Sequence, residues 1–144
     1  MLSDFFVADA ADALRYAQRH EEADEGEEIE RRLNPAQYKN VTGLELGTLW
    51  AILEGAEWNV KKHMPDTISE GEEGESWLHR FPVELTRLLA NLDEAGLCRA
   101  AEDWAETEEM DCDPEELAPL LADLQSLARL AEAPGTSVYL WGCL

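Results

Sequence analysis

Apolar residues near the middle of the chain recur at the spacing of an α-helix. Four of them stand at positions i, i+3, i+4 and i+7, so they share one side of a helix, and this side is predicted to face a core. They are Leu46, Leu49, Trp50 and Leu53. Thr42 is placed to cap the start of this helix, and Gly55 is placed to end it in the left-handed conformation that glycine tolerates.

The same periodicity predicts four further helices. They cover Ala10–Gln18, a stretch from Phe81-Pro82 to Asp93, a stretch that begins at about Glu94, and a stretch from Asp113 to about Ala131. The last begins with an N-cap aspartate, a first-turn proline and two glutamates, and these acids favour the positive end of the helix dipole.

Three shorter runs have the β-branched and aromatic composition of strands: Phe5–Val7, Gln37–Val41 and Thr136–Cys143. The last run is apolar without interruption from Val138 to Trp141, which is typical of a strand buried on both faces. Such a strand needs a neighbour, and the candidates are Phe5–Val7 and Gln37–Val41; pairing of the two chain ends would close the domain. We therefore expect one helix-dominated α+β domain over residues 1–144, with a small sheet formed by short N-terminal and C-terminal strands.

Two segments are rich in acids and glycine and poor in apolar residues. In residues 21–30, carboxylates crowd around Gly26, and like-charge repulsion disfavours a continued helix. Residues 68–76 offer little that could pack against a core. We expect both segments to be mobile, solvated connections.

Composition limits the partners that this chain can have. The 32 Asp and Glu residues against 11 Lys and Arg give a formal net charge of −21 over 144 residues. A surface of this sign is repelled by nucleic acid and by anionic lipid, so neither is an expected partner. The 45% hydrophobic content and the five tryptophans exceed what a disordered chain carries, so the acids must surround a folded core.

The cysteines indicate a reducing compartment, because their number is odd and no CxxC pair occurs. They are Cys98, Cys112 and Cys143, and we expect three free thiols. The chain begins without a basic leader, and no window reaches the roughly 18 apolar residues of a membrane span. These features predict a cytoplasmic protein.

Three hydrophobic runs resemble, in the same order, parts of one known family. The run LGTLWAILEG (Leu46–Gly55) resembles the tryptophan-containing helix of the YfbM-like proteins, which are small bacterial proteins without an established activity. The run FPVELTRLLANL resembles their mid-chain helix, and Glu115–Ala131 followed by SVYLW resembles their closing helix and strand. The resemblance covers about half of the chain and implies a bacterial protein of that fold, without implying a reaction.

No pattern of catalytic or metal-binding residues stands out. His20, His63 and His79 lack the spacing of a zinc site, so we expect surface histidines. Cys112 lies between two aspartates, which disfavour the thiolate that a nucleophile requires. The acidic turn at 70–75 lacks the ligand order of a calcium-binding loop. We predict no metal and no cofactor; nothing supports catalysis, although an enzyme without a recognisable motif stays an alternative.

The tryptophans divide by their surroundings. Those on apolar stripes are predicted core residues: Trp50, Trp104 and Trp141. Trp58 and Trp77 border predicted loops and are expected to be more exposed. Trp77, His79 and Arg80 form a mixed aromatic and basic cluster with the composition of an interface hot spot. In the alternative interpretation, Trp77 and Phe81 only pack the start of a helix against the core.

The densest acidic patch lies between Glu102 and Glu116, where two predicted helices meet. The candidate binding residues there are Glu102, Asp103, Glu106, Glu108, Glu109 and Asp111. Concentrated negative charge accelerates docking to a basic protein. We therefore hypothesise a binding module for a basic protein partner, of the inhibitor or immunity-protein kind. In the alternative, the acids serve only solubility or salt adaptation. The sequence does not predict the oligomeric state.

Overall fold

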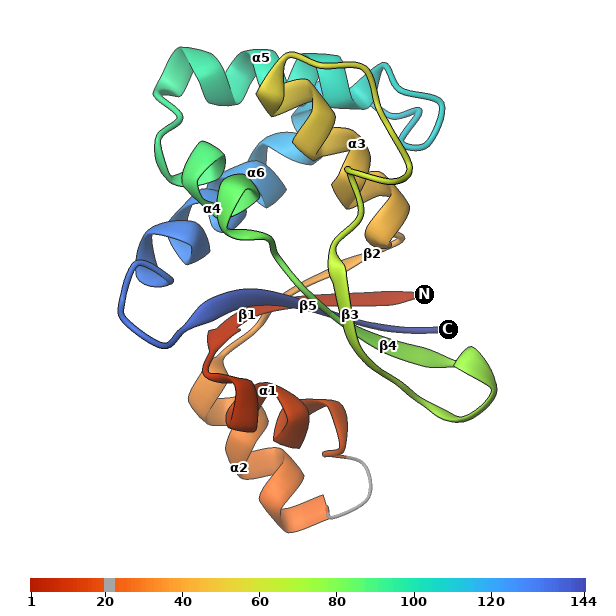
Figure 1. Cartoon of the computed structure of the whole chain (residues 1–144), viewed down its shortest axis with the longest axis vertical. Helices are drawn as coiled ribbons and strands as arrows, with labels where there is room; N and C mark the ends of the chain where they lie inside the picture. The colour runs from red at the N-terminus through yellow and green to blue at the C-terminus, as the bar shows by residue number, and fades with distance from the viewer. Residues whose placement is uncertain (20–22) are drawn as a thin grey trace.

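The computed structural model describes residues 1–19 and 23–144, which form six α-helices and one five-stranded antiparallel sheet (Figure 1). The helices are α1 (Ala10–Ala17), α2 (Ala23–Leu33), α3 (Gly43–Glu54), α4 (Val83–Ala90), α5 (Glu94–Ala105) and α6 (Pro114–Leu130). The strands are β1 (Leu2–Ala8), β2 (Ala36–Lys39), β3 (Asp66–Glu70), β4 (Ser76–Arg80) and β5 (Ser137–Cys143). The predicted helix-dominated α+β domain is confirmed.

The first and last strands pair with each other, which is one of the two pairings that the sequence left open, and both lie inside the sheet. β1 and β5 are antiparallel from Leu2, opposite Cys143, to Ala8, opposite Ser137. The strand order is β2-β1-β5-β4-β3, so the β3–β4 hairpin extends the sheet beyond β5. The predicted strand near residues 37–41 is β2, which lies at the other edge.

Helices cover both faces of the sheet, because successive side chains of a strand point to opposite sides. Phe5 and Leu140 belong to the larger core, which contains residues of α3, α4, α5 and α6. Phe6 and Trp141, one position further along each strand, belong to a smaller core with residues of α1 and α2. Figure 1 shows these two helical layers above and below the strands.

The longest helix, α6, holds the larger core together and also caps its neighbour α4. Its buried side chains include Leu117, Leu120, Leu121, Leu124 and Ala128. Gln125 Nε2 donates to the carbonyl of Leu92 at 2.5 Å, and Arg129 Nε donates to the carbonyl of Ala90 at 3.1 Å. These bonds satisfy carbonyls at the end of α4 that have no partner within the helix.

The predicted start and end of α3 are confirmed. Thr42 and Glu45 form a capping box, and Gly55 ends the helix with a left-handed φ of 72°. The indole nitrogen of Trp104 in α5 donates to the carbonyl of Glu45 at 3.1 Å, so α5 is tied to the first turn of α3.

The exposure of four tryptophans follows the prediction. Trp50, Trp104 and Trp141 are buried, whereas 42% of Trp58 is exposed in the connection between α3 and β3. The three cysteines are free thiols.

The prediction of a solvated connection at 21–30 is wrong where the structure describes it, because α2 begins at Ala23; Glu21 and Glu22 lie outside the described residues. Ile29 is buried against the sheet, and Gly26 approaches Arg19 so closely that a Cβ on Gly26 would lie 2.1 Å from its carbonyl oxygen. Four acids of the helix are exposed, namely Asp24, Glu25, Glu27 and Glu28. The carboxylate of the half-buried Glu30 lies 3.9 Å from Nε of Arg19. Burial of one narrow stripe therefore outweighs the repulsion between the acids.

The sequence predicts a loop over residues 68–76, but both ends of this segment belong to strands. Residues up to Glu70 belong to β3, and Ser76 begins β4, so the turn is confined to residues 71–75. The register shifts between Thr67 and Ser69, which lets Ile68 pack against the smaller core. This irregular strand has few apolar residues and therefore lacks the alternation that would have predicted it.

We expect Leu124→Ala to lower the free energy of unfolding by about 2–5 kcal/mol, because Leu124 is fully buried at the centre of α6. Leu130→Ala is the matched control on the same helix: its side chain is 64% exposed, and the change should cost at most about 0.5 kcal/mol. Urea unfolding of the two variants measures both values. Equal losses would contradict the assigned position of the larger core.

Candidate functional site

The six candidate acids come together at the end of α5 and in the turn that follows it. Glu102 and Asp103 lie on α5, Glu106 is its C-cap, and the other three lie in the connection to α6. All six side chains are exposed. We call Glu102, Asp103, Glu106, Glu108, Glu109 and Asp111 the acidic corner.

The turn folds so that its apolar side chains point inward while its acids point outward. Met110 and Asp111 donate their amides to the carbonyl of Thr107, and Cys112 donates to the carbonyl of Ala105. Asp111 adopts a left-handed φ of 38°, which reverses the chain. Met110 and Cys112 consequently pack against the larger core.

A cavity of about 280 Å³ opens beside the acidic corner, between its turn, the start of α6 and the segment from Tyr38 to Val41. We call it the corner cavity. Its apolar lining is Val41, Met110, Cys112, Leu117 and Leu120. Glu109, Glu116 and Lys39 also line it, so an apolar floor is bordered by charged groups.

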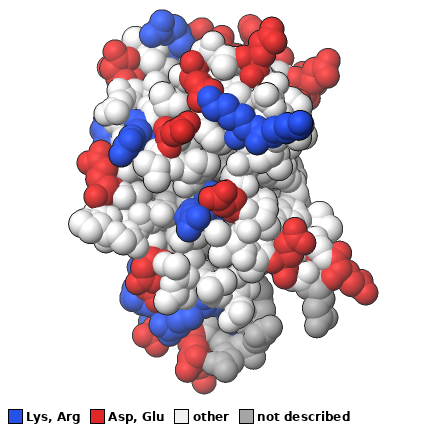
Figure 2. Space-filling view, in the orientation of Figure 1, with Lys and Arg blue, Asp and Glu red and all other residues white. Residues whose placement is uncertain are grey.

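The acids of the corner form no ion pair among the described residues, although Arg99 lies one turn earlier on α5 and Lys39 lines the corner cavity. The sequence holds no Lys or Arg between Glu102 and Glu116. Every ion pair found among the described residues involves other acids, namely Asp4, Asp12, Glu30, Glu54 and Asp66. Figure 2 shows acidic side chains along the top of the molecule, where α5 lies in Figure 1, with basic side chains beside and below them.

Cys112 is poorly suited to nucleophilic chemistry. Burial raises the pKa of its thiol, and the negative charges of Glu116 and Asp113 raise it further. The thiolate is therefore disfavoured, in the direction that the sequence predicts, although burial is a larger cause than the flanking aspartates.

The structure divides the predicted aromatic cluster between the two faces of β4. Trp77 and His79 lie two residues apart on one face, whereas Arg80 faces the other side and pairs with Asp66 at 3.1 Å. Phe81 is buried in the larger core, just before α4 begins. Trp77 and His79 are therefore brought together, and Arg80 is not part of their surface.

Trp77 and His79 line a cavity of about 320 Å³ that we call the hairpin cavity. Its lining is Thr42, Glu70, Gly74, Ser76, Trp77 and His79. Thr67 and His79 are cross-strand partners, and the Thr67 hydroxyl lies 3.2 Å from Nδ1 of His79. Burial lowers the pKa of the His79 imidazole, and the opposing effect of Glu70 is smaller. His79 is therefore neutral near pH 7.

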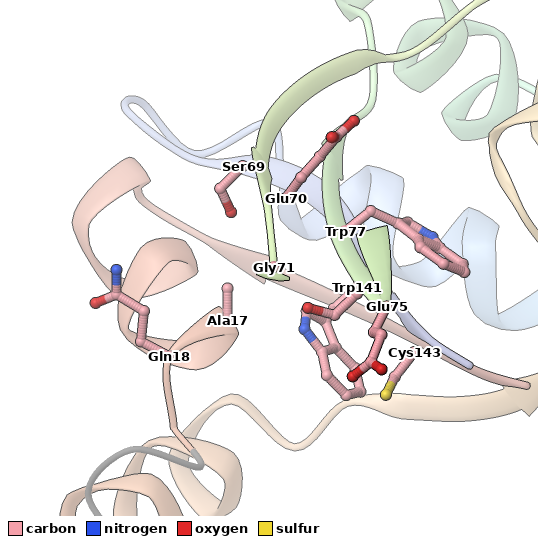
Figure 3. A pocket seen from close by; sticks show the side chains of 10 residues that line it. Ala17, Gln18, Ser69, Glu70, Gly71, Glu75, Trp77, Trp141 and Cys143 are labelled. Atoms are coloured by element: carbon pink, nitrogen blue, oxygen red, sulfur yellow. The ribbon is translucent and has the colours of Figure 1, made fainter. Parts of the chain in front are cut away.

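A larger cavity, of about 520 Å³, lies on the other side of the hairpin, next to the end of α1 (Figure 3). In Figure 3, the side chains of Glu75 and Cys143 come close to the indole of Trp141, while the indole of Trp77 extends away from it. The carboxylate of Glu70 is directed away from this group. Both glutamates line this larger cavity, but the carboxylate of Glu75 lies near Trp141, whereas that of Glu70 is directed away from it.

A buried polar cluster, which the sequence did not reveal, fixes the smaller core. The Tyr16 hydroxyl donates to Asp4 Oδ2 at 2.6 Å, and Arg19 Nη2 lies 3.5 Å from the same oxygen. The guanidinium of Arg19 stacks between the rings of Tyr16 and Trp141, at 4.0 and 4.1 Å from their centroids. Asp4 is 2% exposed, so this cluster stabilises the fold and does not reach a substrate.

His63 is also buried, so the expectation of a surface residue is wrong for it; His20 lies outside the described residues. Nδ1 of His63 accepts the amide hydrogen of Asn59 at 2.9 Å. Nε2 of His63 therefore carries the proton, which it donates to Glu54 at 3.0 Å. With both ring nitrogens engaged and 1% of the side chain exposed, His63 holds the connection between α3 and β3 in place. It cannot serve as a base for an external ligand.

Comparisons with known proteins add no assignment: no family model, no curated protein and no solved structure matches the chain. The resemblance to YfbM-like proteins stays a prediction. Within residues 1–19 and 23–144, no group of His, Cys, Asp and Glu is arranged to hold a metal ion. None of the described helices is long and apolar enough to cross a membrane.

We expect Arg19→Met to lower the free energy of unfolding by about 3–5 kcal/mol, because it leaves the buried Asp4 carboxylate without its cation. The control is Arg15→Met: Arg15 is mostly exposed and pairs with Asp12 at 3.5 Å, and its loss should cost at most about 1 kcal/mol. Urea unfolding measures both. Similar losses for the two variants would show that the buried pair has no special role.

The tyrosines give a pH prediction. The pKa of Tyr38 is raised to about 12 by burial and by its hydrogen bond to Asp123, and burial also raises those of Tyr16 and Tyr139. A raised pKa favours the neutral phenol, so the contribution of Tyr38 to stability is complete below pH 10 and is lost as the pH rises through about 12. We expect little tyrosinate absorbance at pH 10 in the folded protein. Ionisation near pH 10 without unfolding would contradict these environments, and Tyr38→Phe should remove the step near pH 12.

Proposed function

We propose that this protein binds a basic protein partner through the acidic corner and the corner cavity. The proposal rests on one observation above all: six exposed carboxylates gather at one junction of two helices, and none of them has an ion-pair partner among the described residues. Such a group leaves its negative field available to an incoming molecule.

Electrostatics favours a basic protein over other partners. Carboxylates that are not paired internally attract a positively charged surface over roughly 8–10 Å at physiological salt and speed its association. The same charge repels nucleic acid and anionic lipid. Charge alone gives rate and orientation more than affinity, so a second contribution is needed.

The corner cavity supplies this second contribution. Interfaces place apolar, well-packed groups at the centre and charged groups at the rim. Met110 and Val41 line the cavity, while Glu109 and Glu116 stand at its border. A basic partner that inserts one apolar side chain here would bury it beside the carboxylates of Glu109 and Glu116, with Lys39 also at the border.

The proposal places the protein in a reducing, cytoplasmic compartment, in keeping with its three free thiols. It also places it in a bacterium, on the strength of the runs LGTLWAILEG and FPVELTRLLANL and their resemblance to YfbM-like proteins. No geometry in the described residues favours catalysis over binding.

The test compares two pairs of charge-neutralising variants. The pair Glu108→Gln and Glu109→Gln changes the acidic corner, whereas Glu27→Gln and Glu28→Gln removes the same charge from exposed positions on α2. A partner captured from the source cell at low salt is purified, and its association rate with each protein is measured at increasing ionic strength.

We expect a basic partner whose association slows as salt rises, slows several-fold further with the corner pair, and is unchanged with the α2 pair. If both pairs slow association equally, only the net charge matters and the acids serve as a general solvating coat. If no basic partner is recovered, or if its binding ignores salt, the proposal fails.

A further inference from the structure

The hairpin cavity combines an aromatic ring, a carboxylate and a neutral imidazole on one face of the sheet. Glu70 and Trp77 are direct cross-strand partners, so their side chains lie side by side on the same face. His79 stands two residues further along β4, on the same face, and Glu70 is close enough to influence its titration. The three groups therefore border one volume of about 320 Å³.

Two contacts fix the aromatic groups in place. The indole of Trp77 lies across Gly142, where an added Cβ would fall 2.2 Å from its ring nitrogen. His79 is held against the N-terminus of α3, since a Cβ on Gly43 would lie 3.2 Å from its Nε2. The walls of the cavity are therefore set before a ligand arrives, which reduces the ordering cost of binding.

The charges around the cavity favour a cation. Glu70 contributes a carboxylate, and His79 does not oppose a cation near pH 7 because burial keeps its imidazole neutral. The positive end of the α3 dipole is balanced locally, since the Glu45 carboxylate accepts hydrogen bonds from the amide and hydroxyl of Thr42. Arg80 points to the opposite face and pairs with Asp66.

We propose that the hairpin cavity binds the guanidinium group of an arginine side chain. A planar guanidinium can stack on an indole and donate two parallel hydrogen bonds to one carboxylate, which an ammonium group cannot do. The volume lies at the lower end of the roughly 300–1,000 Å³ typical of ligand sites, so it suits one side chain.

If the proposed function holds, the basic partner of the acidic corner is the source of this arginine. Val41 lines the corner cavity, and its neighbour Thr42, the N-cap of α3, lines the hairpin cavity, so only the start of α3 separates the two linings. The proposal therefore extends to one partner surface that contacts both.

The test uses a small probe that does not depend on the acidic corner. The ¹⁵N-labelled full-length protein is titrated at constant ionic strength with Nα-acetyl-arginine N-methylamide, and the tryptophan indole N–H signals are followed. We expect a saturable shift of the Trp77 signal with a Kd on the order of 10 mM, because one exposed ion pair and one stacking contact give weak affinity. The exposed Trp58 should show no saturable shift. The citrulline analogue, which has the same shape without the charge, should not saturate Trp77.

Glu70→Gln should weaken probe binding at least several-fold, whereas Glu75→Gln, a change of the same kind on the other side of the hairpin, should leave it unchanged. The proposal is overturned if the Trp77 signal does not saturate, if citrulline matches arginine, or if Glu70→Gln has no effect. The corner pair Glu108→Gln and Glu109→Gln should not alter probe binding, so failure of the corner proposal leaves this result standing. If a partner binds more weakly to the corner pair but equally well to Glu70→Gln, the idea that one partner contacts both cavities is refuted, and the arginine site itself is not.

Discussion

The antiparallel pairing of β1 with β5 is the contact on which the rest of this structure depends. It joins the two ends of the chain over the whole length of both strands and places them at the centre of the sheet. Because their side chains alternate, Phe5 and Leu140 supply the larger core while Phe6 and Trp141 supply the smaller one. The same pair also carries the hairpin, since β4 adds to the free edge of β5, and Gly142 leaves room there for Trp77.

The central position of β1 also buries a charged side chain on the face of the sheet that carries the smaller core. β1 carries Asp4 into a buried environment, where an isolated carboxylate would be costly. Arg19 and Tyr16 satisfy it, and Arg19 in turn requires Gly26 beside its backbone, which brings α2 against α1. The buried acid is thus satisfied by α1 and by Arg19 shortly after that helix, whereas the acids at the acidic corner stay in solvent.

The sequence predicted those elements whose signal is local. α3 and α6 have a helical apolar stripe and residues that cap them, and β5 has an uninterrupted apolar run, so each was recognised without knowledge of its neighbours. α2 and β3 could not be recognised in this way: of the described side chains of α2 only Ile29 and Leu33 reach the smaller core, amid many acids, and on β3 only Ile68 does so. The same holds for the candidate sites: exposure of the acids follows from their charge, but the cavities arise from tertiary contacts. Trp77 and His79 were singled out, yet their separation from Arg80 follows only once residues 76–80 are known to be a strand.

The arrangement of the two cavities bears on what kind of partner this surface suits. The short segment between β2 and α3 separates them, and it is held firmly: Val41 exchanges hydrogen bonds with the buried Ser3 hydroxyl, and Asn40 adopts a left-handed φ of 63°. A ligand that contacts both cavities must cross this fixed segment and cannot draw them together by moving it. Under both proposals, the partner must carry groups that are already spaced to fit, with an apolar side chain for one cavity and an arginine for the other. A fixed segment of this kind then suits rigid, charge-steered recognition of a folded basic protein better than capture of a flexible basic tail.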